Sequence, residues 1–422
     1  MKHALQWILV FVIAVNIGIS EMSAAEFHQV RRERTTLREG PGSFYPAIAE
    51  LSRGVNVEVI RRLEGWYRVR VQELDGYISA KATQEQASQS AVEDAFSQMG
   101  HQPAVTKVAR SGVSAAVKGF AERFARRLEG DTTLLREMMD YRLDPTEYQA
   151  FREEVYAGRD INRIRGRIDL PSVREHGVFS FSAEGVGYGI ASQLATMGLV
   201  RNRSVRDYVN LVGNLVVEAS GAYDISFKFF VLDLSAVNAY STPGGLVFIT
   251  RGALARMQTE AELACFLGHE IAHVILRHGM QEMEKRKVMI TADNAFMELE
   301  SETSMSDELR QTSDELESIA LESYETIYAG RLQEYEDEAD EYGLLCAARA
   351  GYNPKAMVDF LGRITQENVL SGNNHYTPEQ NTERLNRIQS WLSAWNLPWQ
   401  QLVANFDSFR RHVDWAPETN SE

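Results

Sequence analysis

The stretch TEAELACFLGHEIAHVILRH, residues 259–278, decides the fold expected for the second half of this 422-residue chain. Its apolar residues recur at the three- and four-residue spacing of an amphipathic helix. Thr259 can serve as an N-cap, with Glu262 three residues later as in a capping box, and Gly279 is a typical stop. The pattern predicts a helix of about five turns around the string HEIAH, residues 269–273.

The HEIAH string places two histidines on one helical face. His269 and His273 are four residues apart, so both imidazoles can reach one metal ion, and Glu270 lies close enough to contact a water on that metal. This is the HExxH arrangement of zinc hydrolases. His278 lies about 2.5 turns beyond His269, which predicts that it points to the other side of the helix, near the C-terminus where a cation is favoured.

A catalytic zinc ion usually has three protein ligands and keeps a fourth position for water, so a third ligand is needed. The segment QEYEDEADEYGLLCAARAGYNP, residues 333–354, supplies a candidate. Glu336 and Asp340 are again four residues apart on one face of a predicted helix, which Gly351 and Pro354 end. Other acidic residues surround Glu336, so a solvated acidic face is the competing interpretation.

Three blocks in this order resemble the gluzincin metallopeptidases, which include the prenyl-protein peptidases, the HtpX-type membrane peptidases and the periplasmic BepA-type peptidases. The blocks are NAYSTPGGLVFITRGAL (residues 238–254), HEIAH, and EDEADEYG followed by AGYNP. The resemblance covers about residues 185–392 and implies a mainly helical zincin-type domain with a small edge sheet. It also implies that one Zn²⁺ is bound per chain, that Glu336 is the third ligand, and that Asp340 supports the ligands from behind.

These residue types predict peptide-bond hydrolysis. Two neutral imidazoles and a carboxylate leave zinc with net positive charge, which lowers the pKa of its bound water to about 7. Glu270 is the expected general base. β-Branched and aromatic residues dominate the next strand upstream, so we expect it to border the cleft and to pair with an extended substrate. The residues expected to make this contact are Gly245, Leu246, Val247 and Phe248.

A donor for the developing oxyanion is expected in NNHYTPEQNTERLNRI, residues 373–388. The resembling peptidases often have Thr-His-Pro followed by an arginine here, whereas this chain has His-Tyr-Thr-Pro. The candidates for this donor are His375, Tyr376 and Arg384. In some of the resembling peptidases a histidine of this region caps the zinc in a resting state, which His375 could do here. A plain loop histidine and a surface arginine are the competing interpretations.

The N-terminus predicts export. Lys2 precedes the apolar run ALQWILVFVIAVNIGI, residues 4–19, and Ser23-Ala24-Ala25 offers small residues for cleavage. Residues 1–25 therefore have the form of a signal peptide, which would place the protein in the periplasm or elsewhere outside the cytoplasm. The run is short for a membrane span, and an uncleaved anchor is the alternative. No integral span is expected after cleavage.

Composition is that of an ordinary globular protein, with 44% hydrophobic and 24% charged residues. The net charge of −15 argues against nucleic acid and anionic membranes as main partners. Much of it lies in a predicted acidic helical insertion at about residues 280–330, either solvated or a lid over the cleft. The two cysteines, Cys265 and Cys346, lie in the two ligand-bearing segments, and a disulfide and two buried thiols both fit.

A second module precedes the peptidase. Residues 26–84 contain strand-like runs such as VNVEVI and WYRVRV, separated by glycine-rich turns. They predict a small all-β barrel and resemble the bacterial SH3-like domain, which implies a cell-wall or envelope-protein partner. Four aromatic residues either form its binding face or fill its core: Phe44, Tyr45, Trp66 and Tyr67.

The expected fold class is multidomain α+β. Its parts are a signal peptide (1–25), the barrel (26–84), a linker (85–104), a helical segment packed on the peptidase (105–184), the metallopeptidase domain (185–392) and a tail (393–422). Three functions compete: a zinc endopeptidase acting on misfolded or envelope proteins, a non-catalytic or latent periplasmic adaptor or chaperone, and a cell-wall peptide hydrolase. Glu270 favours a peptidase, because a purely structural zinc site has no need of it.

Overall fold

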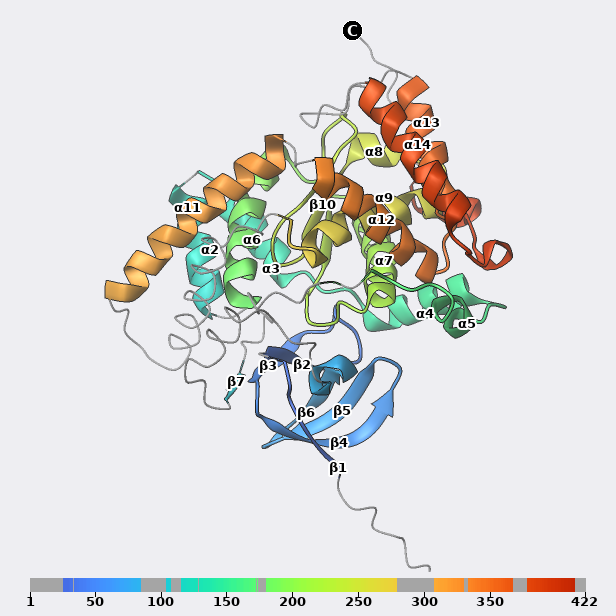
Figure 1. Ribbon diagram of the computed structural model, residues 1–422. Helices are drawn as coiled ribbons and strands as arrows, with labels where there is room; N and C mark the ends of the chain where they lie inside the picture. Colours follow the sequence, from blue (N-terminus) through green and yellow to red (C-terminus); the bar gives the residue numbers. More distant parts are fainter. Residues whose placement is uncertain are drawn as a thin grey trace, which may run out of the picture.

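The computed structural model describes residues 26–32, 34–84, 104–107, 115–127, 129–171, 173, 180–278, 307–329, 333–366 and 378–413. A small all-β part lies beneath a larger, mainly helical part (Figure 1). This arrangement confirms the predicted fold class.

The all-β part is the predicted SH3-like barrel. Its sheet has the strand order β1-β4-β5-β6-β2-β3-β7. Along β5 every second side chain points inward, and Val69 and Val71 join Leu37, Val57 and Ile78 in a small core. The bounds are β1 (Glu26–Gln29), β2 (Arg34–Arg38), β3 (Ala47–Ser52), β4 (Asn56–Leu63), β5 (Trp66–Val71), β6 (Leu74–Ser79) and β7 (Val105–Lys107).

Strand β7 comes from beyond the predicted linker. It pairs antiparallel with β3, so that Val105 lies opposite Leu51 and Lys107 opposite Ala49. The barrel sheet is therefore extended by three residues that the sequence analysis assigned to the helical segment.

A small sheet lies within the helical part, in the order β8-β10-β9. Its strands are β8 (Lys228–Leu232), β9 (Ala239–Ser241) and β10 (Leu246–Thr250). Strand β10 is central, parallel to β8 on one side and antiparallel to β9 on the other. The prediction that Gly245, Leu246, Val247 and Phe248 pair with a substrate is therefore wrong, because both edges of this strand are already paired.

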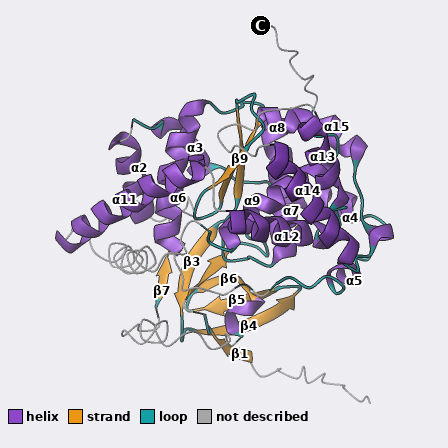
Figure 2. Cartoon of the chain, turned by 45° about the horizontal axis from the view of Figure 1, so that its top comes forward, coloured by secondary structure: helices purple, strands orange, loops and turns teal. Residues whose placement is uncertain are grey.

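Helices cover both faces of this sheet (Figures 1 and 2). Val247 and Ile249 of β10 point into one hydrophobic core, whereas Leu246 and Phe248 point into the other. The second core is completed by α2 (Ala115–Arg127), α3 (Thr132–Asp140), α6 (Ser180–Leu194) and α11 (Asp307–Ala329).

The first core is larger and holds the predicted metal-ligand segments. The helices around it are α4 (Pro145–Tyr156), α7 (Arg203–Ser220), α8 (Arg251–Arg256), α9 (Glu260–Ile275), α12 (Gln333–Arg349), α13 (Lys355–Gln366), α14 (Pro378–Ala394) and α15 (Phe406–His412). A smaller apolar cluster joins α5 (Ile161–Arg165) to α12. Cys265 and Cys346 are buried and free, as two thiols.

The barrel docks on the helical part through its aromatic residues. The ring centroids of Trp66 and Tyr223 are 4.8 Å apart, and those of Phe44 and Tyr148 are 4.5 Å apart. Tyr67, in contrast, packs against the barrel core. The four predicted aromatic residues therefore do not form one external face.

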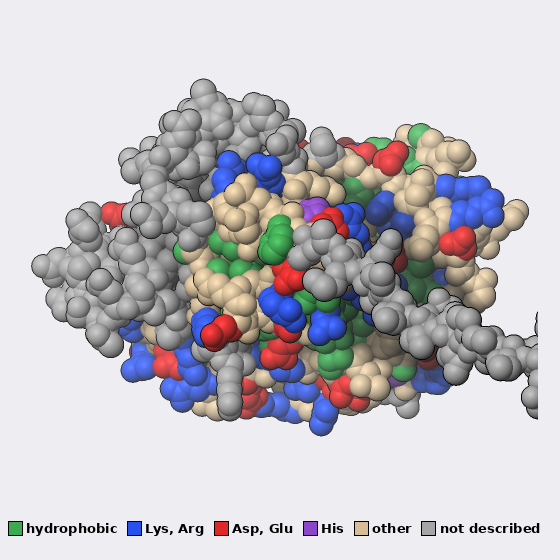
Figure 3. Space-filling model, turned by 90° about the horizontal axis from the view of Figure 1, so that it is seen from below, with side chains coloured by type: hydrophobic (Ala, Val, Ile, Leu, Met, Phe, Trp, Pro, Cys, Tyr) green, Lys and Arg blue, Asp and Glu red, His purple; other side chains and the backbone are tan. Residues whose placement is uncertain are grey.

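Charged residues accompany this docking. Arg38 is buried and donates hydrogen bonds to the carbonyl oxygens of Tyr223 and Asp224 and to Ser226 Oγ. The Asp224 carboxylate accepts from Thr35 Oγ1 at 2.7 Å and from Arg32. On the face seen from the barrel side, basic and acidic side chains are interspersed (Figure 3).

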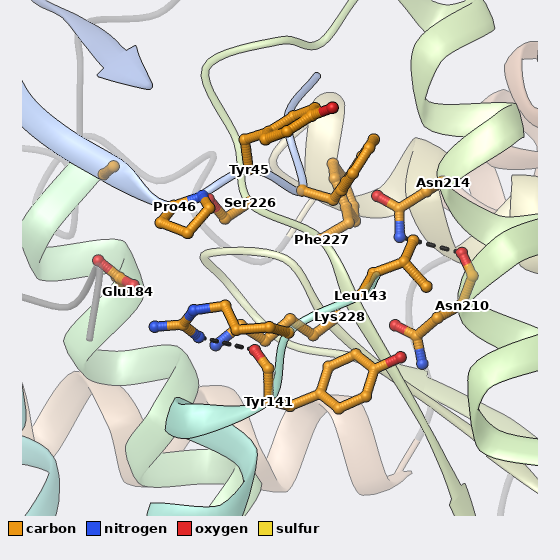
Figure 4. Close-up of a pocket in the computed structure, with 13 residues that line it drawn as sticks. Tyr45, Pro46, Tyr141, Leu143, Glu184, Asn210, Asn214, Ser226, Phe227 and Lys228 are labelled. Carbon is orange, nitrogen blue, oxygen red and sulfur yellow. Dashed lines mark hydrogen bonds between the residues drawn. The ribbon is translucent and has the colours of Figure 1, made fainter. Parts of the chain in front are cut away.

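A small cavity remains at the interface. Tyr45 and Pro46 line it from the barrel, and Glu184, Asn214 and Lys228 line it from the helical part (Figure 4). Its volume of about 30 Å³ is enough for a water molecule.

Some predictions fall on residues outside the described ranges. The signal peptide and the part of the acidic insertion before Asp307 are among them. The later part of the insertion is α11, whose Leu316 and Ala320 are fully buried in the second core. In the described ranges no helix combines the length and the apolar character that crossing a membrane requires.

Candidate metal centre

The centre is built on two helices, α9 and α12, which lie side by side (Figure 1). Their backbones touch at Gly268 and Gly343. A Cβ atom added at Gly268 would lie 2.6 Å from the Gly343 carbonyl oxygen, and the reverse addition gives the same distance. Only glycine permits this approach, which brings the ligand-bearing faces of the helices together.

The start of α9 is as predicted. Thr259 is the N-cap, and its Oγ1 accepts a hydrogen bond from the Glu262 N–H at 3.1 Å. The Glu262 carboxylate reaches back to the backbone N–H of Gln258 at 2.8 Å. This capping fixes the helix, and with it the direction of HEIAH.

His269, His273 and Glu336 converge on one point. The two histidine Nε2 atoms are 3.1 Å apart. Glu336 lies 3.2 Å from His269 Nε2 through Oε2 and 3.4 Å from His273 Nε2 through Oε1. Ligand atoms about 2.0–2.2 Å from a tetrahedral zinc ion are about 3.3–3.5 Å from one another. The three residues therefore fit a zinc ion in both ligand type and spacing.

Asp340 lies behind His269. Its Oδ1 is 2.8 Å from His269 Nδ1, and Arg384 donates to both carboxylate oxygens at 2.7 and 2.8 Å. Burial alone would raise the pKa of Asp340, but Arg384 and His269 outweigh it and lower that pKa to about 2. Burial would likewise lower the pKa of His269, but Asp340 and Glu336 raise it to about 9. An ionised Asp340 thus holds the proton on His269 Nδ1 and leaves Nε2 directed to the centre.

Arg384 was predicted as an oxyanion donor, but its side chain lies behind a proposed metal ligand instead. Its Nε and Nη2 atoms face Asp340, behind the ligand. Outside the described residues lie the other two candidates, His375 and Tyr376. Glu270 is 6% exposed and follows His269 on α9.

The predicted orientation of His278 is wrong. Helix α9 ends at Ile275, and Arg277 has a φ of +57°, so the chain turns back after the last helical residue. His278 Nδ1 then lies 2.8 Å from His273 Nδ1, and its Nε2 lies 3.1 Å from Glu338 Oε2. The prediction failed because it extended the helix three residues too far. The sequence carries no signal for a left-handed arginine at this point.

Parts of the chain are similar to known proteins. Residues 204–392 match the family described as Peptidase family M48, and residues 33–84 match the family described as Bacterial SH3 domain. The putative beta-barrel assembly-enhancing protease of Vibrio cholerae is 27% identical over 187 residues, which are 41% of this chain and 37% of the relative. The corresponding protease of Escherichia coli K12 is 27% identical over 177 residues, covering 40% and 34%.

A mitochondrial relative matches the same part. Metalloendopeptidase OMA1 of Schizosaccharomyces pombe is 26% identical over 188 residues, 44% of this chain and 52% of the relative. The matched region thus spans about a third to a half of these curated relatives. Both the family match and the two ligand-bearing helices fall in residues 204–392, so the metal centre lies in the part of this chain that matches peptidase family M48, and residues 33–84 match a bacterial SH3 domain.

Proposed function

We propose that this protein is a zinc-dependent endopeptidase in which His269, His273 and Glu336 hold one Zn²⁺. The observation that carries the proposal is the triangle of ligand residues. Their nearest ligand atoms are 3.1, 3.2 and 3.4 Å apart, with the two Glu336 contacts made through different carboxylate oxygens, and Glu270 follows His269 in the part of the chain that matches this family. All three ligands are buried, at 3–8% exposure, so they meet a metal away from bulk water.

The residues divide the work of hydrolysis among themselves. A bound zinc ion supplies a Lewis acid and lowers the pKa of the attacking water. Glu270 accepts the proton of that water and returns it to the leaving amine. Asp340 and Arg384 keep His269 in the tautomer that directs Nε2 to the centre. In this arrangement Arg384 acts through Asp340, and the donor for the oxyanion is left to another residue, with His375 as the candidate.

We infer that the substrates are misfolded or envelope proteins in the periplasm. The export signal expected in residues 1–25 supports this location, and the bacterial relatives are named for assembly of β-barrels. The adaptor and cell-wall alternatives both depend on a ligand of the barrel. Two of its candidate aromatic residues, Phe44 and Trp66, contact the peptidase part instead, which favours the peptidase.

The substitution Glu270→Gln tests the proposal. It removes the base but none of the proposed ligands, so the variant should still hold about one zinc ion per chain while cleavage of casein or unfolded chains falls by at least about 100-fold. Glu334→Gln, at an exposed acid of α12, is the matched control and should keep wild-type activity. Equal cleavage by the wild type and Glu270→Gln would refute the assignment. Release of peptides from peptidoglycan, without protein cleavage, would favour the cell-wall hydrolase.

A further inference from the structure

The two histidines of the centre are supported differently from behind. His269 Nδ1 faces the carboxylate of Asp340, whereas His273 Nδ1 faces a second imidazole, that of His278, at 2.8 Å. A histidine that binds a metal almost always donates its other ring N–H to an acceptor, which fixes the tautomer and the ring orientation. The acceptor for His273 is therefore a histidine whose own protonation must be set by something else.

Counting protons fixes the direction of both hydrogen bonds. His273 Nε2 faces His269 and Glu336, so Nε2 is the ligand atom and Nδ1 must carry the proton. His278 Nδ1 must then accept, which leaves the proton of neutral His278 on Nε2. That atom lies 3.1 Å from Glu338 Oε2, which accepts it. With His278 neutral, its Nδ1 accepts a hydrogen bond from His273 and its Nε2 donates one to Glu338.

Burial and ring stacking hold the His278 side chain in this position. Its side chain is fully buried, and its ring lies parallel to that of Tyr335, with centroids 4.7 Å apart and 12° between the planes. The left-handed backbone of Arg277 delivers it to this position. Glu338 is different, because 61% of its side chain is exposed. A buried ligand is thus linked through one imidazole to a carboxylate at the surface.

We propose that His278, oriented by Glu338, is a positioning residue for His273 and sets the affinity of the centre for zinc. This inference rests on the proposed zinc site but is separate from catalysis, because neither residue belongs to the ligand triangle. Since partners behind a ligand commonly change metal affinity by about 10–100-fold, the loss of the His278 acceptor should weaken zinc binding by that factor.

Two substitutions of His278 separate hydrogen bonding from packing. His278→Phe keeps a ring that can stack on Tyr335 but removes the acceptor, and its dissociation constant for zinc should rise about 10–100-fold. His278→Asn places an amide oxygen near the position of Nδ1, so it should recover most of the affinity. The measurement is a competition titration of the metal-free full chain with a chromophoric chelator. Visible spectra of the cobalt-substituted proteins should change for His278→Phe and return toward wild type for His278→Asn.

Substitution of Glu338 tests the second hydrogen bond, from His278 to the surface carboxylate. Glu338→Ala should weaken zinc binding several-fold, because His278 loses the group that selects its tautomer, whereas the control Glu334→Ala on the same helix should not. Wild-type affinity in folded His278→Phe overturns the proposal. If His278→Phe does not fold, unchanged affinity in Glu338→Ala overturns it instead. Neither result affects the proposed function, which would fail only if the wild type bound no zinc or if Glu270→Gln remained active.

Discussion

At the scale of single residues, His269 is supported by a buried ion pair between Asp340 and Arg384. Asp340 is 1% exposed, and Arg384, itself 7% exposed, balances its charge through two hydrogen bonds, with His269 as its other partner. Breaking a buried ion pair by removing one partner leaves an uncompensated charge, which costs more than the pair itself contributes.

Arg384→Ala should therefore destabilise the metal-free protein by about 3 kcal/mol. The thermal unfolding midpoint of the chelator-treated chain measures this effect. Arg126→Ala is the control, because the side chain of Arg126 is 66% exposed in its ion pair with Glu122 and should contribute less than about 1 kcal/mol. Similar midpoints for the two variants would contradict a charge-balancing role for Arg384.

Residue spacing on a regular helix was the reliable part of the sequence analysis. The four-residue spacings of His269 with His273 and of Glu336 with Asp340 placed each pair on one face, because both pairs lie inside helices. His278 failed because it lies beyond a helix end. The contact of Arg384 with Asp340 joins α14 to α12, and spacing along the chain carries no information about such a contact.

At the scale of elements, the approach of α9 to α12 determines the shape of the centre. The Gly268–Gly343 contact lies one residue before His269 and seven residues beyond Glu336. A methyl group between the backbones would push the helices apart, and the ligand triangle would widen with them.

Gly268→Ala should lower stability by about 1–3 kcal/mol and weaken zinc binding as well. Chelator titration and thermal unfolding on the same sample measure both effects. Gly119→Ala in α2 is a matched control, since the nearest atom to its added Cβ is an arginine nitrogen 3.7 Å away. That variant should be neutral or slightly more stable, because alanine favours helix. Full stability in Gly268→Ala would show that the helices can separate without loss.

The wrong assignment of β10 is also explained at this scale. The run LVFIT is apolar without alternation, and all five residues are buried, as is typical of a strand covered on both faces. Its composition correctly predicted a strand. The further step, from this composition to a strand at the edge of the cleft, was wrong, because the same residues also suit a central strand.

At the scale of the whole molecule, a barrel carboxylate lies buried among charges of both parts. Glu50 is 8% exposed, and burial raises its pKa to about 7, although a hydrogen bond from Thr36 and the charges of Arg38 and Arg34 oppose the shift while that of Asp224 adds to it. The folded chain therefore retains a proton that the unfolded chain releases above about pH 4.5. The stabilising effect of this proton is complete below that pH and is lost as the pH rises through about 7.

Glu50→Gln should remove this pH dependence. Glutamine can still accept from Thr36 and carries no charge, so the variant should gain about 1–3 kcal/mol over the wild type at pH 8 and little at pH 4. Unfolding midpoints across this range, with Glu73→Gln at an exposed acid of the same barrel as control, measure the difference. A constant difference at every pH would contradict the interpretation.

Metal removal is also a property of the whole molecule. A ligand that binds only the folded state stabilises it by about 3–4 kcal/mol at 100–1,000 times its dissociation constant. A chelator should therefore lower the unfolding midpoint of the wild type, and zinc should restore it. Glu270→Gln should respond in the same way, whereas His269→Ala should respond little. If neither chelator nor zinc changed the unfolding midpoint of the wild type, that result would count against the proposed centre.

The domain division expected from the sequence stays a prediction, but β7 changes what a truncation would contain. A fragment ending at residue 84 would lack strand β7, which pairs with β3. It would also lack the Asp224 carboxylate that Arg32 and Thr35 bind, and the Tyr223 ring that covers Trp66. It would therefore expose an apolar ring and a sheet edge that invite self-association. Conversely, a nick between residues 84 and 104 should leave both fragments together on a sizing column and separate them only in denaturant. The barrel, although it has its own sequence profile, is completed by the remainder of the chain.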